Sequence, residues 1–209
     1  MSADKSATSA TSETTTAPAN QIPAGGRKRR IFRTILLIVA AIVVVFVGVV
    51  AVQPPDFRIS RSTTIDAPPS ALFAQVNDFH NWEAWSPWAK LDPAAKNSFE
   101  GASAGTGAIF KWSGNDQIGE GKMTVTESRP DELVRIKLEF VRHFEDTSTA
   151  EFTFQPEGNG TVVTWSMYGR KKFINKAICL FMDMDKMLGG EFEKGLAQMK
   201  TVAETAAGK

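Results

Sequence analysis

The chain has 209 residues and nearly balanced charge, with 24 Lys and Arg against 23 Asp and Glu. A net charge of +1 gives no broad attraction to nucleic acid, so the sequence predicts no nucleic-acid partner. The single cysteine, Cys179, excludes an intramolecular disulfide, and His80 and His143 belong to no metal-binding motif. We therefore expect no metal and no cofactor.

Residues 1–30 are rich in Ser, Thr, Ala and Pro and end in a cluster of Arg and Lys. They hold too few apolar side chains to offset the entropy lost on ordering. We expect a disordered, basic-ended tail whose simplest role is that of a spacer.

An uninterrupted apolar run follows, in which residues 34–52 carry no charge. As a helix it would span roughly 28 Å, close to the ~30 Å hydrocarbon core of a bilayer. We expect a single transmembrane helix at residues 31–53. The alternative, a cleaved signal peptide, has a shorter apolar core and an A-x-A site, and this sequence shows neither.

The basic residues directly before the apolar run predict the orientation of the chain, because Lys and Arg near a membrane-spanning helix tend to stay in the cytoplasm. We expect a single-pass protein of the cell membrane, with a cytoplasmic N-terminus and an extracytoplasmic C-terminal domain.

The remaining residues alternate between patterns typical of strands and of helices. The sequence predicts a strand at 57–65, a short helix at 70–77 and a helical or irregular piece at 81–88. Six further strands are expected at 98–100, 105–113, 119–128, 132–141, 146–155 and 161–168. A long, interrupted C-terminal helix follows, in which Gly189 and Gly190 mark a kink, a start or a close backbone approach.

This order predicts an α+β domain, in which a curved antiparallel sheet wraps a long C-terminal helix and short helices close one end. The order resembles the Bet v 1-like superfamily, also called START-related or SRPBCC, in its polyketide cyclase/dehydrase branch. The resemblance covers residues 57–205 and rests on separated motifs at residues 61–69, 81–88, 119–123, 181–186 and 192–196. It implies a helix-grip domain at residues 57–207. Because that superfamily includes lipid carriers, hormone receptors and cyclases, the fold does not choose among functions.

The strands place aromatic, aliphatic and sulfur-containing side chains on the face expected to meet the helix. Such a lining suits an apolar ligand, and the alternative is that these side chains simply form a filled core. The predicted ligand-binding residues of this lining are Phe110, Trp112, Met123, Phe140, Phe152, Trp165 and Met167.

Arg61 shares the inward parity of Ile59 and Thr63 on the first strand. Because a buried guanidinium needs partners, Arg61 is expected either to bind a ligand carboxylate or phosphate, or to pair with a carboxylate such as Asp183 or Asp185.

Trp82, Trp85 and Trp88 are spaced by three, as one face of a short helix requires. They are predicted to close one end of the domain or to form the rim of its pocket, where they would also be available to a membrane surface.

Taken together, the residues favour a membrane-anchored module that binds a hydrophobic small molecule or lipid as a carrier, scavenger or sensor. The first alternative is a cyclase, dehydratase or hydrolase of hydrophobic substrates. That reading needs a proton-transfer group in the cavity, for which Arg61, Tyr168 and Glu120 are the candidates, and we assign no catalytic residue. The second alternative is a ligand-free interaction domain of an envelope complex.

Overall fold

The computed structural model describes residues 25–142, 146–206 and 208. Its helices and strands are α1 (Gly25–Val52), β1 (Asp56–Ile65), α2 (Pro69–Asn77), η1 (Phe79–Asn81), α3 (Trp82–Trp85), β2 (Lys96–Gly101), β3 (Ala108–Ser113), β4 (Glu120–Arg129), β5 (Leu133–Phe140), β6 (Asp146–Glu157), β7 (Gly160–Arg170), α4 (Phe173–Cys179) and α5 (Met184–Ala206). The predicted tail at residues 1–30 lies largely outside the described residues.

The chain divides into two compact units, and the boundary between them along the chain falls between residues 47 and 48. Most of α1 belongs to the first unit. This helix is long and apolar enough to cross a membrane, and large side chains such as Leu37 and Val44 are exposed along it. Exposed apolar side chains on every side of a helix are what a lipid environment requires.

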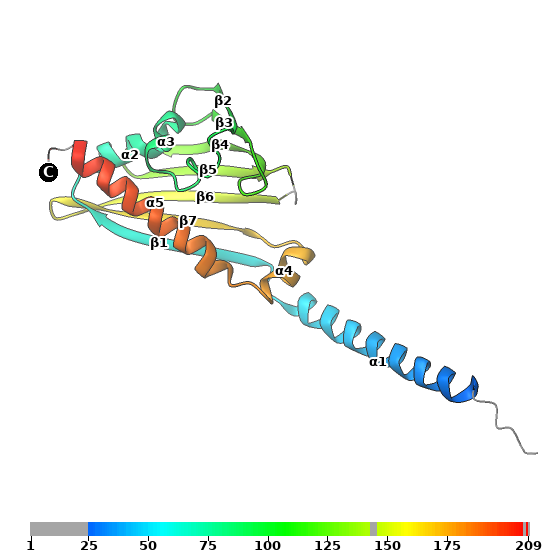
Figure 1. Ribbon diagram of the computed structural model, residues 1–209. Coiled ribbons are helices and arrows are strands. Elements are labelled where there is room, and N and C mark those ends of the chain that lie inside the picture. Colours follow the sequence, from blue (N-terminus) through cyan, green and yellow to red (C-terminus); the bar gives the residue numbers. More distant parts are fainter. Residues whose placement is uncertain (1–24, 143–145, 207, 209) are drawn as a thin grey trace, which may run out of the picture. The chain divides into compact units, whose positions relative to one another are not determined.

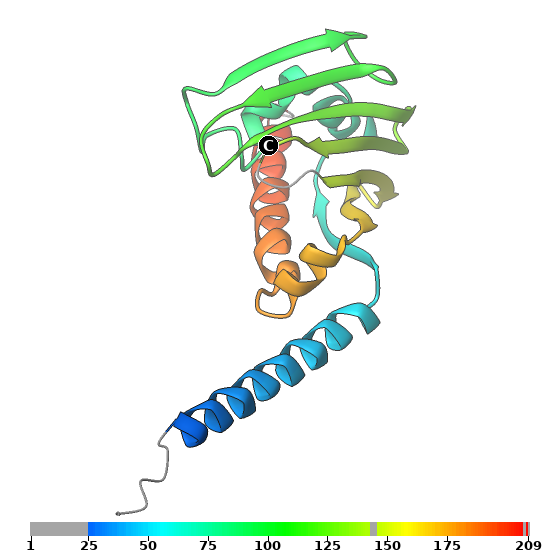
Figure 2. The same ribbon diagram turned by 90° about the vertical axis from the view of Figure 1, so that its right-hand side faces the viewer.

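The second unit contains one seven-stranded antiparallel sheet in the order β1-β7-β6-β5-β4-β3-β2. Figures 1 and 2 show the sheet curving, with α5 along its β1–β7 half and α2 and α3 beside the C-terminal part of α5. The predicted α+β helix-grip architecture is confirmed. Among the strands, β2, β3 and β7 each differ by three residues in length from the expected 98–100, 105–113 and 161–168.

Strand alternation separates a concave face, which meets the helices, from a convex face. Along β6, Ala150, Phe152 and Phe154 are buried, whereas the intervening Thr149 and Glu151 are only partly buried. The neighbouring strands pair in register, with Phe152 opposite Trp165 of β7. The concave face therefore forms the core, and the convex face carries the polar side chains.

The C-terminal helix is interrupted, as predicted, but the break lies between α4 and α5 rather than at the two glycines. Gly189 and Gly190 lie inside α5. At Gly189 the close approach comes from a side chain, because a Cβ atom there would overlap the guanidinium of Arg61. A close approach at Gly189 therefore exists, but it is made by a side chain and not by the neighbouring backbone that was expected.

Candidate functional site

An aromatic stack forms the centre of the core beneath α5. The Trp165 ring lies between Phe152, with ring centroids 4.8 Å apart, and Phe192 of α5, with centroids 4.3 Å apart. Both pairs are stacked and all three residues are buried. Stacking on two faces fixes the position of the indole, since rings in such contact pack at close to crystal density. Phe152 and Trp165 are thus core residues as well as predicted ligand contacts.

The three spaced tryptophans surround this stack. Trp82 and Trp85 of α3 are buried, and their indole nitrogens donate to the carbonyl oxygens of Val76 and Gln75 at 3.0 Å each. Trp88 follows the helix and is partly buried, with its ring centroid 5.6 Å from that of Trp165. Trp82 and Trp85 therefore close this end of the sheet, and Trp88 keeps an exposed edge.

One buried donor has no acceptor among the described residues. Trp165 is 2 % exposed and its Nε1 makes no hydrogen bond to them. The opposite edge of the indole faces α5, because a Cβ atom on Gly195 would lie 2.8 Å from Trp165 Cζ3. An unsatisfied buried N–H group costs about 1–3 kcal/mol of stability.

Beyond the aromatic stack, the concave face of the sheet continues over β5, β4 and β3. There Phe110, Met123 and Leu138 lie side by side in register on β3, β4 and β5. The next row places Trp112, Gly121 and Phe140 side by side. We call this the open apolar surface; its partly exposed members are Phe110, Trp112, Leu138 and Phe140.

Aromatic contacts hold the open apolar surface together. Phe110 and Trp112 stack with centroids 6.1 Å apart, and Phe140 meets Trp112 edge-on at 5.9 Å. A Cβ atom on Gly121 would overlap the Trp112 ring, so glycine lets the indole lie flat on the sheet. Two predicted residues are buried: Met123 lies between Phe110 and Leu138 on the sheet, and Met167 lies on β7 opposite Ala150. The surface is therefore preformed by ring packing.

Strand parity also places two polar residues on the concave face that were not predicted as site residues from the sequence. Asp146 and Ser148 share the parity of Ala150 and Phe152, and Asp146 lies opposite Phe140. Asp146 accepts a hydrogen bond from Asn175 of α4 at 3.2 Å. The alternation in β6 is regular, so extending it from Ala150 by two residues reaches Ser148 and by four residues reaches Asp146.

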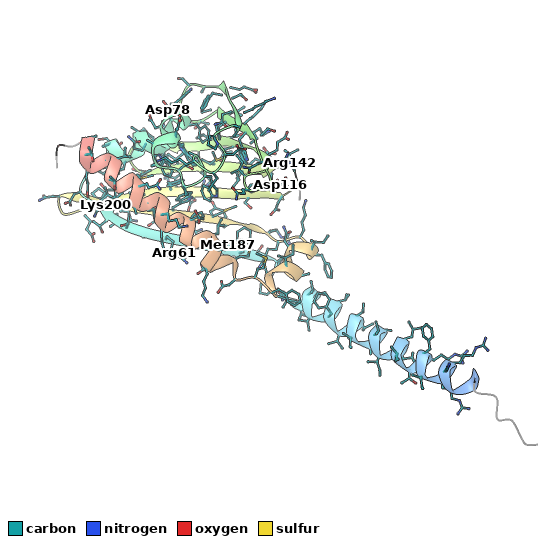
Figure 3. The ribbon with its side chains drawn as sticks, in the orientation of Figure 1. Arg61, Asp78, Asp116, Arg142, Met187 and Lys200 are labelled. Atoms are coloured by element: carbon teal, nitrogen blue, oxygen red, sulfur yellow. The ribbon has the colours of Figure 1, made fainter. Side chains whose placement is uncertain are left out.

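Arg61 is held by α5, as Figure 3 shows beside Met187. Its guanidinium donates to Asp185 Oδ2 at 2.9 Å and to Glu193 Oε1 at 2.7 Å. These hydrogen bonds raise the pKa of Arg61, and the same contact lowers the pKa of Asp185. The predicted pairing with Asp185 is confirmed, Glu193 is an additional partner, and Asp183 instead accepts from the Lys186 backbone.

The other two candidate proton-transfer residues lie on the convex face. Tyr168 donates to Glu151 at 3.1 Å, and Arg135 and Arg58 donate to the same carboxylate at 2.9 and 3.2 Å. Burial alone would raise the pKa of Glu151, but these hydrogen bonds outweigh it and hold that pKa below its ordinary value. Burial and Glu151 together raise the pKa of Tyr168. Glu120 lies on the same face.

Two surface hollows border the open apolar surface, because Trp112 lines the first and Asp146, opposite Phe140, lines the second. A hollow of about 410 Å³ lies on the convex face, where Lys111, Lys122 and Glu139 contribute to its lining. A second, of about 720 Å³, lies beside α4 and includes Lys171, Lys172 and Lys176. Both linings are rich in charge, which suits polar groups better than an apolar ligand.

The chain belongs to the family described as "Polyketide cyclase / dehydrase and lipid transport", whose model matches residues 56–204. This match covers the whole sheet and most of α5. A search of the curated proteins finds no significant match.

Similar solved structures support the fold. A protein of unknown function from Staphylococcus aureus, SA2116, has a TM-score of 0.56 at 12% identity, covering 74% of this chain and 97% of its own. CV1439 from Chromobacterium violaceum has a TM-score of 0.52 at 15% identity, and the match covers 73% of this chain and 99% of CV1439. The di-domain ARO/CYC StfQ of the steffimycin biosynthetic pathway has a TM-score of 0.54 at 14% identity, and the match covers 74% of this chain and 52% of StfQ. At these identities the likeness extends to the fold alone.

Proposed function

We propose that this domain binds a hydrophobic small molecule or lipid on the open apolar surface and that α1 anchors it to a membrane. The observation that carries the proposal is that Phe110, Trp112 and Phe140 stay partly exposed while packed into a preformed aromatic array. Partly exposed aromatic side chains beside a finished core are typical of ligand sites. The family description, which includes lipid transport, agrees with this reading.

Each predicted contact has a defined role in this proposal. Phe110, Trp112 and Phe140 would contact the apolar body of the ligand, with Met123 beside Phe110 and Met167 further along the buried face on β7. Phe152 and Trp165, with Trp82 and Trp85, would act indirectly, as the buried aromatic core beside the ligand surface. Trp88 would form the rim. Arg61 would position α5, since two carboxylates already occupy its guanidinium.

Binding can be tested with cis-parinaric acid, a polyene fatty acid that accepts excitation energy from tryptophan. Leu138→Asn and Lys137→Asn form a matched pair, because they are adjacent on β5 but face opposite sides of the sheet. Losing the apolar contact of one leucine costs about 1.5–3 kcal/mol, which is roughly a 10- to 100-fold loss of affinity. We expect that loss for Leu138→Asn and none for Lys137→Asn. Equal affinities would refute the site.

The proposed anchoring includes an orientation, with the N-terminus in the cytoplasm and the domain outside it. Its support is the basic cluster directly before the apolar run and the absence of charge within residues 34–52. Alkaline phosphatase, which is active only outside the cytoplasm, can be fused to the C-terminus. High activity is expected, whereas an inactive, fully expressed fusion would reverse the orientation.

The enzymatic alternative gains one observation from the structure. Asp146 is a carboxylate with concave parity, beside Phe140 of the open apolar surface. A cyclase or dehydratase would use such a group to move a proton. Screening the chain and Asp146→Asn against aromatic polyketide-like substrates distinguishes the functions. Turnover that Asp146→Asn abolishes would establish the enzyme, and binding without turnover would support the carrier.

A further inference from the structure

Helix α4 is apolar, yet none of its residues is buried. Phe173 and Ile174 are 49% and 57% exposed. The exposure continues beyond the helix to Leu180, Phe181, Met182 and Met187. We call residues 170–187 the α4 segment. Such a concentration of exposed large apolar side chains indicates a surface that meets an apolar environment.

The α4 segment is bonded to the chain directly after the apolar run. The Lys171 backbone N–H donates to the Pro55 carbonyl oxygen at 2.7 Å, and Lys176 Nζ donates to the Gln53 carbonyl oxygen at 2.8 Å. Because the apolar run ends at Val52, these bonds hold α4 beside the residues that leave the hydrocarbon core. A bilayer that contains the run therefore has its headgroup layer at this level.

The charges of the segment complement an anionic lipid surface. Arg170, Lys171, Lys172 and Lys176 all line the hollow of about 720 Å³, in which Asp146 is the acidic member. Lys and Arg flanking exposed apolar side chains are the composition of helices that lie in a membrane interface.

We propose that the α4 segment lies in the membrane interface, with its apolar side chains among the lipids and its lysines at anionic phosphate groups. The inference rests on the proposed anchoring by α1 and adds a second contact, which brings α4 and the adjoining start of α5 to the lipid surface. A lipid leaving the bilayer would then meet the domain next to Phe140, since Asp146 opposite Phe140 is hydrogen-bonded to Asn175 of α4.

The native Cys179, the one cysteine of the chain, lies within α4 and accepts a spin label without any substitution. The full chain would be reconstituted in nanodiscs of phosphatidylcholine with about 30% phosphatidylglycerol. Power saturation with oxygen and with a water-soluble nickel chelate then reports the depth of the label. The matched control is Asn159→Cys in a Cys179→Ser background, at the β6–β7 turn.

We expect the label at Cys179 to be more accessible to oxygen than to nickel, and the label at position 159 to show the reverse. The double variant Phe173→Ser with Ile174→Ser should move the Cys179 label into water. The control Leu91→Ser, which replaces an exposed leucine outside the α4 segment, should not. Arg170→Gln with Lys171→Gln should weaken the dependence on phosphatidylglycerol, because two of the four cations of the hollow are removed.

A Cys179 label as accessible to nickel as the control, in a chain recovered in the nanodisc, would overturn the membrane contact and leave the anchor intact. It would assign the exposed side chains to a protein partner instead. Failure of the chain to enter nanodiscs at all would overturn the anchor and this inference together.

Discussion

Gly195 and Gly190 offer the same substitution in two environments on one helix. A Cβ atom at Gly195 would lie 2.8 Å from Trp165 Cζ3 and 3.0 Å from Pro87 Cδ, whereas a Cβ at Gly190 meets nothing within 4 Å. Alanine is favoured over glycine inside a helix by about 1 kcal/mol, and this gain is common to both variants. Their difference in unfolding free energy therefore isolates the steric cost at Gly195.

The neighbours of Gly195 cannot give way easily. Trp165 is stacked on both faces by Phe152 and Phe192, and Pro87 is a ring. Overpacking a core of this kind costs about 1–3 kcal/mol. We expect Gly190→Ala to stabilise the chain by about 1 kcal/mol and Gly195→Ala to be about 1–3 kcal/mol less stable than Gly190→Ala. Guanidinium unfolding in detergent, followed by tryptophan fluorescence, measures both, and equal stabilities would refute the rigidity assigned to the stack.

Three further variants test the assigned roles. Glu151→Gln should reduce the loss of stability at acid pH. A carboxylate whose pKa is lowered by folding stabilises the protein above its unfolded pKa of about 4.3, and it loses that contribution as the pH falls through the folded pKa. Urea unfolding at pH 7 and pH 3 measures the effect, and identical pH profiles of the variant and the parent chain would contradict it. Trp165→Phe should cost less than about 1.5 kcal/mol, since lost packing is offset by removal of an unsatisfied N–H group; a loss above about 3 kcal/mol in denaturant titration would mean that Nε1 has an acceptor. Arg61→Met should change the affinity for parinaric acid less than about twofold, because Asp185 and Glu193 already hold the guanidinium; a tenfold loss for the acid but not for its methyl ester would establish a ligand clamp.

The sequence predicted the order of the elements because strands such as β5 and β6 alternate apolar and polar residues and several of the turns carry glycine or proline. It also predicted that Phe110, Trp112 and Phe140 share one face, which follows from period two alone. The sequence did not predict which side chains of that face are buried. Phe152 and Trp165 are covered by Phe192, and Phe110 and Trp112 are not, because the cover depends on where α5 crosses the sheet.

The partners of Arg61 show the same limit. Parity placed its side chain on the inward face, and Asp183 and Asp185 were the carboxylates named as possible partners. Glu193 was not foreseen, because it lies two turns further along α5 and is reached only when Gly189 lets the guanidinium lie against the helix. The exposure of the α4 side chains did not follow from the sequence either, because an apolar helical period cannot tell burial against a sheet from burial in lipid.

Native mass spectrometry of the full chain released from its own membrane, with lipid extraction of the same sample, tests the central claim most directly. The account predicts one lipophile retained per chain after the detergent is removed, and its loss in Leu138→Asn but not in Lys137→Asn. A bare chain mass in all three proteins, with extracted lipids matching the bulk membrane, would contradict a binding role for the open apolar surface.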